Sequence, residues 1–294
     1  MEFLRPATWE DALALKAQHP SAVPIAGGTD VMVELNFDRR RPDALLDLDR
    51  LRELREWQVE EDGTVRLGAS VPYAAIISGL RDRLPALALG AHTVGSPQIR
   101  NRGGVGGNLG SASPAGDAHP PLLASGGAVE AESVRGVRMI PIDEFYLGVK
   151  RNALAADELI RAIHVPSARG PQQFAKVGTR NAMVIAVCSF AVALHPHTRD
   201  VRTGIGSAAP TPRRAREAEA FVVAELADTG LWDSGAELPL ATARRFGEAV
   251  ALAASPIDDV RGSAAYRRHA LAVLARRTLL RTWNEHRATG RAVA

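Results

Sequence analysis

Short apolar segments with helical or strand spacing divide the first half of the chain into alternating elements. Thr8 precedes Trp9–Leu15, whose first turn is acidic, and this is typical of a capped helix. Asp62-Gly63 separates two strand-like segments, which predicts a β-hairpin. Further helices are expected at Asp30–Leu35, Val71–Leu80 and Leu84–Ala91, and strands at Ala44–Leu48, Trp57–Glu60, Thr64–Gly68, Ala128–Ala131, Val137–Ile140 and Asp157–Pro166.

The second half reads as strands followed by helices. Ser167–Gln172 contains Gly and Pro and is the best candidate for a linker. Strands are expected at Phe174–Val177, Val184–Leu194 and Val201–Ser207, and helices at Arg214–Leu226, Ala241–Ala254 and Ser263–Trp283. This order predicts an α+β fold, with helices on one face of a small antiparallel sheet.

The segment Thr93–Pro120 is rich in glycine, and most of its glycines lie in and around GGVGG at Gly103–Gly107. Glycine lets the backbone approach a ligand closely, and turned-in N–H groups form a nest for an anion such as phosphate. A second glycine pair lies upstream in Ala26–Asp30, again with an acidic residue following. Two such loops suit the pyrophosphate and hydroxyls of a dinucleotide.

The plainer interpretation of each loop is a turn, and for Ala26–Asp30 alone a turn is favoured. Thr93–Pro120 is different, because a structureless loop of this length is uncommon in a compact domain unless it is functional or disordered. Interleaved apolar residues such as Ile99 and Leu109 argue against disorder. Neither loop matches the Rossmann or P-loop fingerprint, and we expect no amphipathic helix after GGVGG, so a bound nucleotide would need another architecture.

Composition excludes several classes of function. The 294 residues are 46% hydrophobic, which is enough for one large or two ordinary domains. The formal net charge of +3, from 36 basic and 33 acidic residues, argues against nucleic acid as a partner. The single cysteine, Cys188, can neither form an internal disulfide nor hold an iron–sulfur cluster. With no long apolar run, we expect a soluble, cytoplasmic protein without membrane insertion.

The chain shows no catalytic apparatus of its own. Its histidines are scattered, with only His195 and His197 close together, and they predict no metal site. There is no G-x-S-x-G nucleophile elbow. We therefore expect neither catalytic residues nor metal ligands, so any redox chemistry belongs to a cofactor.

Several ordered segments resemble the FAD-binding medium subunit of the molybdenum hydroxylases, the xanthine and carbon monoxide dehydrogenase family. The similarity runs almost from end to end of the chain, and the segments are much more specific together than either glycine loop alone. They are Ala26–Asp30, Gln98–Asn108, Ala112–Asp117, Asp143–Gly148, Asp157–Ile160, Ala209–Ala215 and Arg261–Arg268.

The resemblance implies an α+β fold of the vanillyl-alcohol oxidase (PCMH) type. The FAD-binding domain would span 1–170, in subdomains of about 1–55 and 56–170, followed by a C-terminal domain at 171–294. It also implies non-covalent FAD and two partners: a small [2Fe–2S] subunit and a large molybdopterin subunit, arranged as a dimer of heterotrimers. This chain would pass electrons from the clusters through FAD to an external acceptor. The single cysteine argues against the hydroxybenzoyl-CoA reductase branch, whose medium subunit carries an extra cluster.

The resemblance also assigns cofactor-binding residues. They are Ile25, Ala26, Gly27, Gly28, Thr29, Asp30 and Val31 in the first loop, Gly104, Val105, Gly106, Gly107 and Asn108 in the second, and Asp117, Ile160 and Lys176 elsewhere. Asp117 would bind hydroxyls on the adenosine side, and Lys176 would lie by the flavin ring or its linker. For Lys176, a surface lysine on a strand stays open as the alternative.

The sequence departs from the family pattern at two places. The loop after Lys176 lacks the acidic residues of the xanthine dehydrogenase branch, and Gly104 stands where the family usually has a residue with a hydroxyl group. Two other functions also remain open. The chain could instead be a stand-alone FAD-dependent oxidoreductase of the same fold, although no candidate base lies near the loops. It could also be an interaction protein that has lost FAD, although both loops and Asp117 are intact.

Overall fold

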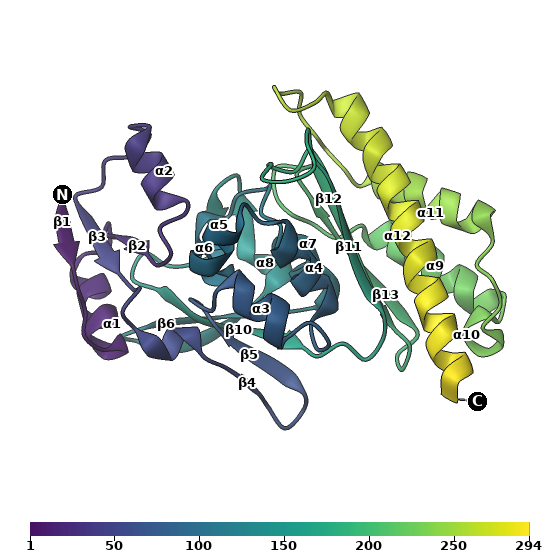
Figure 1. Cartoon of the computed structure of the whole chain (residues 1–294), viewed down its shortest axis with the longest axis horizontal. Coiled ribbons are helices and arrows are strands. Elements are labelled where there is room, and N and C mark those ends of the chain that lie inside the picture. The colour runs from purple at the N-terminus through teal and green to yellow at the C-terminus, as the bar shows by residue number, and fades with distance from the viewer. Residues whose placement is uncertain (294) are drawn as a thin grey trace.

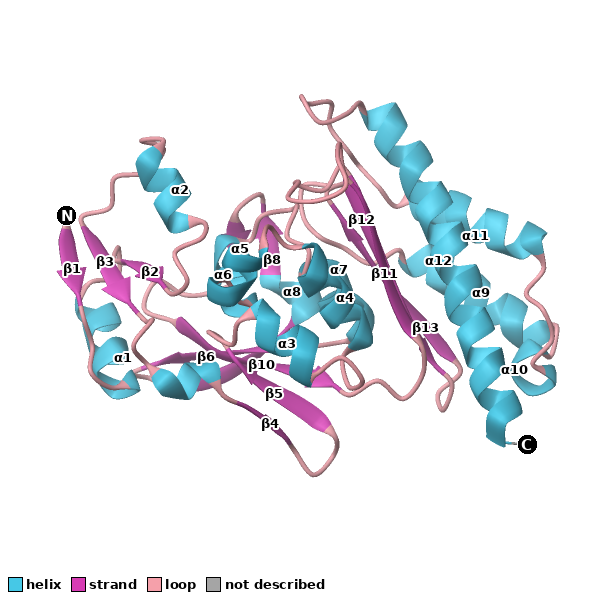
Figure 2. Cartoon of the chain, viewed as in Figure 1, coloured by secondary structure: helices cyan, strands magenta, loops and turns pink. Residues whose placement is uncertain are grey.

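A small parallel sheet begins the chain in this computed structural model, which describes residues 1–293 (Figures 1 and 2). Its strands are β1 (Glu2–Leu4), β3 (Ala44–Asp47) and β2 (Val23–Ile25), in that order. Helices α1 (Trp9–Gln18) and α2 (Val31–Asn36) connect them. Thr8 accepts from the Asp11 amide while Asp11 accepts from the Thr8 amide, so the expected cap is confirmed.

The middle of the molecule is a five-stranded antiparallel sheet with helices over one face (Figure 2). Its order is β4 (Trp57–Val59), β5 (Thr64–Gly68), β10 (Leu159–Pro166), β6 (Ala128–Ser133) and β7 (Gly136–Pro141). The covering helices are α3 (Tyr73–Gly79), α4 (Pro85–Thr93), α5 (Pro97–Arg102), α6 (Val105–Ser111), α7 (His119–Ser125) and α8 (Ile142–Phe145). A short helix η1 (Arg52–Arg55) and the pair β8 (Tyr146–Gly148) and β9 (Arg151–Asn152) complete this part. The hairpin at Asp62-Gly63 is confirmed.

The expected long loop at Thr93–Pro120 is wrong, because α5, α6 and the start of α7 fall within it. Glycine has low helix propensity, so a glycine-rich segment carries no helical signal. Local features supply the stability instead: Ser96 caps α5 with Pro97 in its first turn, and α6 buries its own Val105 and Leu109 side chains. The expectation that no helix follows GGVGG was therefore also wrong.

The C-terminal part is a three-stranded antiparallel sheet between two layers of helices (Figure 1). The elements are β11 (Gln172–Val177), β12 (Cys188–His195), β13 (Asp200–Gly206), α9 (Arg216–Asp228), α10 (Leu231–Ser234), α11 (Leu240–Leu252) and α12 (Ala264–Val293). Helices α9 and α12 pack on one face of the sheet, and α4 and α7 of the middle part pack against it from the other side. The α+β class is confirmed.

Two details of this part differ from expectation. Strand β12 begins at Cys188 instead of Val184, because the neighbouring strand β11 ends at Val177, which pairs with Cys188. Helix α12 continues beyond Trp283 to Val293. No helix within residues 1–293 is long and apolar enough to cross a membrane.

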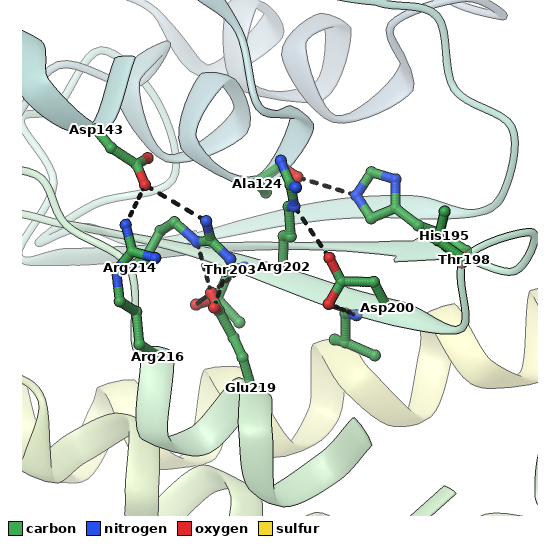
Figure 3. A network of polar contacts seen from close by, with 11 residues as sticks. Ala124, Asp143, His195, Thr198, Asp200, Arg202, Thr203, Arg214, Arg216 and Glu219 are labelled. Carbon is green, nitrogen blue, oxygen red and sulfur yellow. Dashed lines mark hydrogen bonds and ion pairs between the residues drawn. The ribbon is translucent and has the colours of Figure 1, made fainter. Parts of the chain in front are cut away.

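A polar network ties the C-terminal part to the middle part (Figure 3). Asp143 of α8 forms ion pairs with Arg214, which precedes α9, and with Arg216, the first residue of α9. Glu219 accepts hydrogen bonds from the Thr203 amide at 2.8 Å and the Thr203 hydroxyl at 2.7 Å. Both oxygens of Glu219 also bond Arg214, so this buried carboxylate is fully satisfied. We call these residues the Asp143 network.

Candidate functional site

The first glycine loop, Ile25–Val31, lies directly on the second. It connects β2 to α2, and Figure 1 shows α2 on the same side of the molecule as α5 and α6. A Cβ on Gly27 would collide with the carbonyl oxygen of Arg102, and the Thr29 side chain lies against Gly103. The two segments are therefore in contact although they are far apart in sequence, as a shared ligand would require.

The second segment forms the start of α6. Gly104 precedes the helix, and the Gly106 amide donates to the carbonyl of Ala69 at 3.0 Å. A Cβ on Gly106 would collide with that carbonyl, so close packing on the chain explains this glycine. The side chain of Asn108 accepts from the Ala118 amide, which ties α6 to the start of α7.

Gly107 lies in α6 on an exposed side that the chain leaves open. No atom of the chain lies within 4 Å of a Cβ built on Gly107, and the same holds for Gly110 one turn later. Glycine within a helix costs about 1 kcal/mol relative to alanine, so packing gives no reason for either residue. Both leave the backbone accessible to a ligand.

Asp117 and Lys176 form a buried ion pair across the junction between the middle and C-terminal parts. The Lys176 ammonium lies 2.6 Å from Asp117 Oδ2, and the Thr93 hydroxyl donates to the same oxygen at 3.1 Å. The ammonium also donates to the Thr93 carbonyl at 3.2 Å. Both side chains are less than 9% exposed, so Lys176 is not a surface lysine.

The other oxygen of Asp117 has no hydrogen-bond partner in the chain, although it is buried. A buried carboxylate oxygen without a donor is costly, and such an atom calls for an explanation. Burial raises the pKa of Asp117, while the charge and hydrogen bond of Lys176 oppose that rise. A ligand hydroxyl is the kind of donor that Oδ1 would accept.

Three aromatic residues near this carboxylate, Tyr73, His119 and Tyr146, were not identified from the sequence as candidate site residues. The His119 Nδ1 and Tyr146 hydroxyl lie 2.8 Å apart, while His119 Nε2 and the Tyr73 hydroxyl are buried without partners. Burial lowers the pKa of His119 to about 3, so its ring is neutral, and burial raises the pKa of Tyr73. His119 follows Asp117 by two residues, which was a usable signal, but nothing in the sequence marked Tyr73.

Ile160 has a different environment from the other assigned residues. It lies on β10 at 7% exposure within the apolar core of the middle part, and β10 packs against α6. Arg180 lies in the loop after β11 and donates to the carbonyls of Ala182 and Met183. The structure therefore brings the two loops together and pairs Asp117 with Lys176, while Ile160 lies in the core.

Two grooves along the junction are separate from these loops. One, of about 440 Å³, is lined by Asp143, Tyr146 and Arg214, and the other, of about 890 Å³, lies between α4 and α12. The residues that line them include none of the assigned cofactor-binding residues. Within residues 1–293, no cluster of three or more His, Cys, Asp or Glu side chains could hold a metal ion.

The site as a whole suits a ligand that carries phosphates and hydroxyls. An anion can approach the accessible backbone at Gly107, and Asp117 Oδ1 can accept a hydrogen bond from a ligand hydroxyl. These are the features that a non-covalent FAD would need from the chain. The site contains no nucleophile with an adjacent base and no metal cluster within the described residues.

Comparison with known proteins gives matches over nearly the whole chain. Residues 1–168 match the family model described as "FAD binding domain in molybdopterin dehydrogenase", and residues 173–282 match "CO dehydrogenase flavoprotein C-terminal domain". The chain is 32% identical to the xanthine dehydrogenase FAD-binding subunit of Escherichia coli O157:H7, covering 94% of this chain and 93% of that protein. It is also 32% identical to the nicotine 6-hydroxylase medium subunit of Paenarthrobacter nicotinovorans, covering 95% and 96%.

The fold has close counterparts among solved structures. A chain of the carbon monoxide dehydrogenase from Hydrogenophaga pseudoflava superposes with a TM-score of 0.87 at 27% identity. The superposition covers 97% of this chain and 98% of that one. The arrangement of sheets and helices described above is therefore one that this dehydrogenase shares.

Proposed function

The chain belongs to the FAD-binding medium subunits of the molybdenum hydroxylases, and on this premise we propose that it passes electrons from a partner's [2Fe–2S] clusters through FAD to an external acceptor. One observation carries the proposal: the two glycine loops are in contact, and near them the buried carboxylate of Asp117 has one oxygen without a hydrogen-bond donor. When bound, FAD supplies a centre that takes up electrons and releases them to an acceptor.

The chain's own part in this function is to bind and orient the cofactor. The backbone of Ile25–Val31 and Gly104–Asn108 would hold the phosphates through those N–H groups that are not already bonded within the chain, as the Gly106 amide is, because nests of N–H groups bind anions. Asp117 would accept from a hydroxyl of the cofactor, and burial keeps water away from that bond. No proton transfer by a side chain is needed for this role.

The electron source must lie on another chain. Cys188 is the only cysteine, it is buried, and burial raises the pKa of its thiol to about 12. A [2Fe–2S] cluster takes about four ligands, mostly cysteine thiolates. We propose a small cluster-bearing subunit and a large molybdopterin subunit as partners, in a dimer of heterotrimers located in the cytoplasm. The relatives described as medium subunits or medium chains support this assembly.

Native mass spectrometry of the complex purified through a tag on this chain tests the assembly. We expect two further chains, one carrying iron and sulfide and the other molybdenum, in equal amounts with this one. A preparation of this chain alone that carries FAD and turns over an organic substrate would replace the proposal with a stand-alone FAD-dependent oxidoreductase. If the chain purified from cells rich in FAD carried no flavin, the remaining interpretation would be an interaction protein of the same fold that has lost FAD.

A further inference from the structure

We propose that a cluster-bearing partner subunit docks on an exposed surface formed by α2 and the tip of the β8–β9 hairpin. The partner's docking face is apolar and carries acidic residues at its rim. The surface, called here the α2–hairpin surface, comprises Met32, Val33, Phe37, Leu147 and Val149 with the basic residues Arg39, Arg40, Lys150 and Arg151 around them. This inference rests on the proposed function and adds to it the place and chemistry of docking.

Helix α2 exposes apolar side chains that the chain does not cover. None of its residues is buried, and Met32 and Val33 are both exposed. Phe37, which follows the helix, is 69% exposed. Figure 2 shows α2 standing clear of the helices over the central sheet. Neighbouring apolar side chains that are left in water mark an interaction site, because burying them is favourable.

The tip of the β8–β9 hairpin extends this apolar surface. Leu147 and Val149 are exposed there. The ammonium of the next residue, Lys150, lies 2.6 Å from Glu34 Oε1 on α2. Two segments that lie 116 residues apart in the sequence are therefore in direct contact. Val149 follows the hairpin to this ion pair and Val33 precedes Glu34, so the apolar side chains belong to one surface.

The α2–hairpin surface adjoins the candidate cofactor site on two sides. Beside the first glycine loop, a Cβ on Gly28 would lie 3.4 Å from the Met32 side chain. On the other side, the Asn152 side chain donates to the Gly110 carbonyl of α6 at 3.0 Å. Electrons pass between two cofactors only over a short distance. A subunit that delivers electrons to the flavin must therefore dock beside this site, as a partner on this surface would.

The charges of the surface decide which kind of partner fits. Ion pairs within it already engage its acidic groups, namely Glu34 with Lys150 and Asp38 with Arg41. Arg39 and Arg151 have no acidic partner within residues 1–293, and Arg40 reaches only Glu34, at 3.9 Å. The other acid nearby, Asp30, belongs to the first glycine loop. The surface thus has an excess of positive charge, and an acidic partner complements it.

A second copy of this chain fits the surface less well. In a two-fold symmetric dimer the same patch of both copies meets, so the arginines of one copy would face those of the other. Like charges brought together in this way repel. The excess of positive charge therefore favours a different chain as the occupant.

Photo-cross-linking in the native complex tests the docking directly. With p-benzoylphenylalanine introduced at Phe37, we expect a cross-link to the iron-bearing chain, within a peptide that contains Asp or Glu. The matched control carries the same group at Val137, an exposed apolar position on β7. It should give no cross-link to the iron-bearing chain.

Reconstitution of this chain with the purified iron-bearing chain gives the second readout. Val149 and Val137 are 58% and 56% exposed, so Val149→Glu and Val137→Glu are a matched pair. Val149→Glu should weaken partner binding at least about tenfold, because docking would bury a carboxylate, whereas Val137→Glu should bind as the native chain does. The flavin content of both variants should be native.

Salt dependence separates the basic rim from the apolar centre. Arg151→Glu should slow association with the iron-bearing chain about tenfold at low salt, and much less at about 1 M salt, where charges are screened. Arg244→Glu makes the same charge change at an exposed residue of α11 and should leave the association rate unchanged.

Other results would overturn the inference. These are equal partner binding by Val149→Glu and Val137→Glu, or Phe37 cross-links only to the molybdenum-bearing chain or to a second copy of this chain. Binding of the native chain to phosphatidylserine-containing vesicles that is lost in Arg151→Glu would assign the surface to a membrane instead. A native complex without any iron-bearing chain would refute the proposed function itself, and this inference with it.

Discussion

The Asp117–Lys176 pair and the Asp143 network cross the same junction, yet their hydrogen bonding is different. In the Asp143 network, Glu219 uses both oxygens within the chain (Figure 3). In the other pair, Asp117 uses Oδ2 only and buries Oδ1 without a donor. A buried network in which every polar atom is hydrogen-bonded stabilises a fold. A buried carboxylate with one oxygen unbonded indicates instead a binding site for a ligand that donates a hydrogen bond. We therefore expect substitutions in the Asp143 network to change the stability of the fold, and substitutions at Asp117 to change the affinity for FAD.

The largest effect on the cofactor should come from Gly107→Val. Its Cβ points where the chain has no atoms within 4 Å, so the fold should persist while the side chain blocks a ligand at the backbone. We expect purified protein without flavin, measured as the flavin absorbance relative to that of protein.

Gly106→Val is the matched control, because its Cβ would collide with the Ala69 carbonyl and should destabilise the fold itself. Full flavin content in Gly107→Val would show that the cofactor does not approach α6.

Glu219→Ala should give the largest loss of stability within the Asp143 network. It removes hydrogen bonds to the Thr203 amide and hydroxyl and the partner of Arg214, which together should cost about 2–4 kcal/mol. Urea denaturation of apoprotein measures this change, and the FAD Kd of the folded fraction should stay unchanged. A tenfold weaker FAD would mean that the two regions are coupled.

Asp117→Asn should show the opposite pattern. The neutral amide keeps the shape but loses a charged acceptor, so FAD binding should weaken by about 1.5–3 kcal/mol. Asparagine is preferred to alanine here, because alanine would leave the buried Lys176 without any hydrogen-bond partner at this position. Asp143→Asn serves as the control and should leave the FAD Kd unchanged. Equal Kd values for both variants would remove the distinction between the two regions.

Arg216→Ala should have the smallest effect. Its side chain is 68% exposed, and an exposed ion pair is worth about 1 kcal/mol or less. The midpoint of urea denaturation should shift slightly, and less so at high salt, where the pair is screened. A loss as large as that of Glu219→Ala would mean that exposed charge, and not the buried carboxylate, holds the junction.

Local signals made much of the fold predictable. The α1 cap at Thr8, the hairpin at Asp62-Gly63 and strand β3 each depend on a few neighbouring residues, and all were found. Helices α5 and α6 were missed because packing and caps, and not propensity, stabilise them. The start of β12 was misplaced because an apolar run does not show where the neighbouring strand β11 ends, which is at Val177 opposite Cys188.

The site was predictable only in part, for the same physical reason. Glycine-rich segments marked the two loops, and Gly27 against Arg102 gives their contact a steric basis. The pairing of Asp117 with Lys176 could not be predicted, since it depends on how β11 docks on α4 and not on sequence spacing. The buried hydroxyl of Tyr73 likewise depends on packing between elements far apart in sequence.

The most direct test of the central claim is the flavin absorption spectrum of the purified chain, shown to be free of molybdenum and iron, before and after each of two additions. Dithionite should bleach the flavin bands, because the cofactor exchanges electrons without help from a substrate site. A purine, an aldehyde or carbon monoxide should leave the bands unchanged, because the proposed function assigns substrate oxidation to a partner subunit. Bleaching by one of these substrates alone would contradict the electron-transfer account and identify a self-sufficient flavoenzyme.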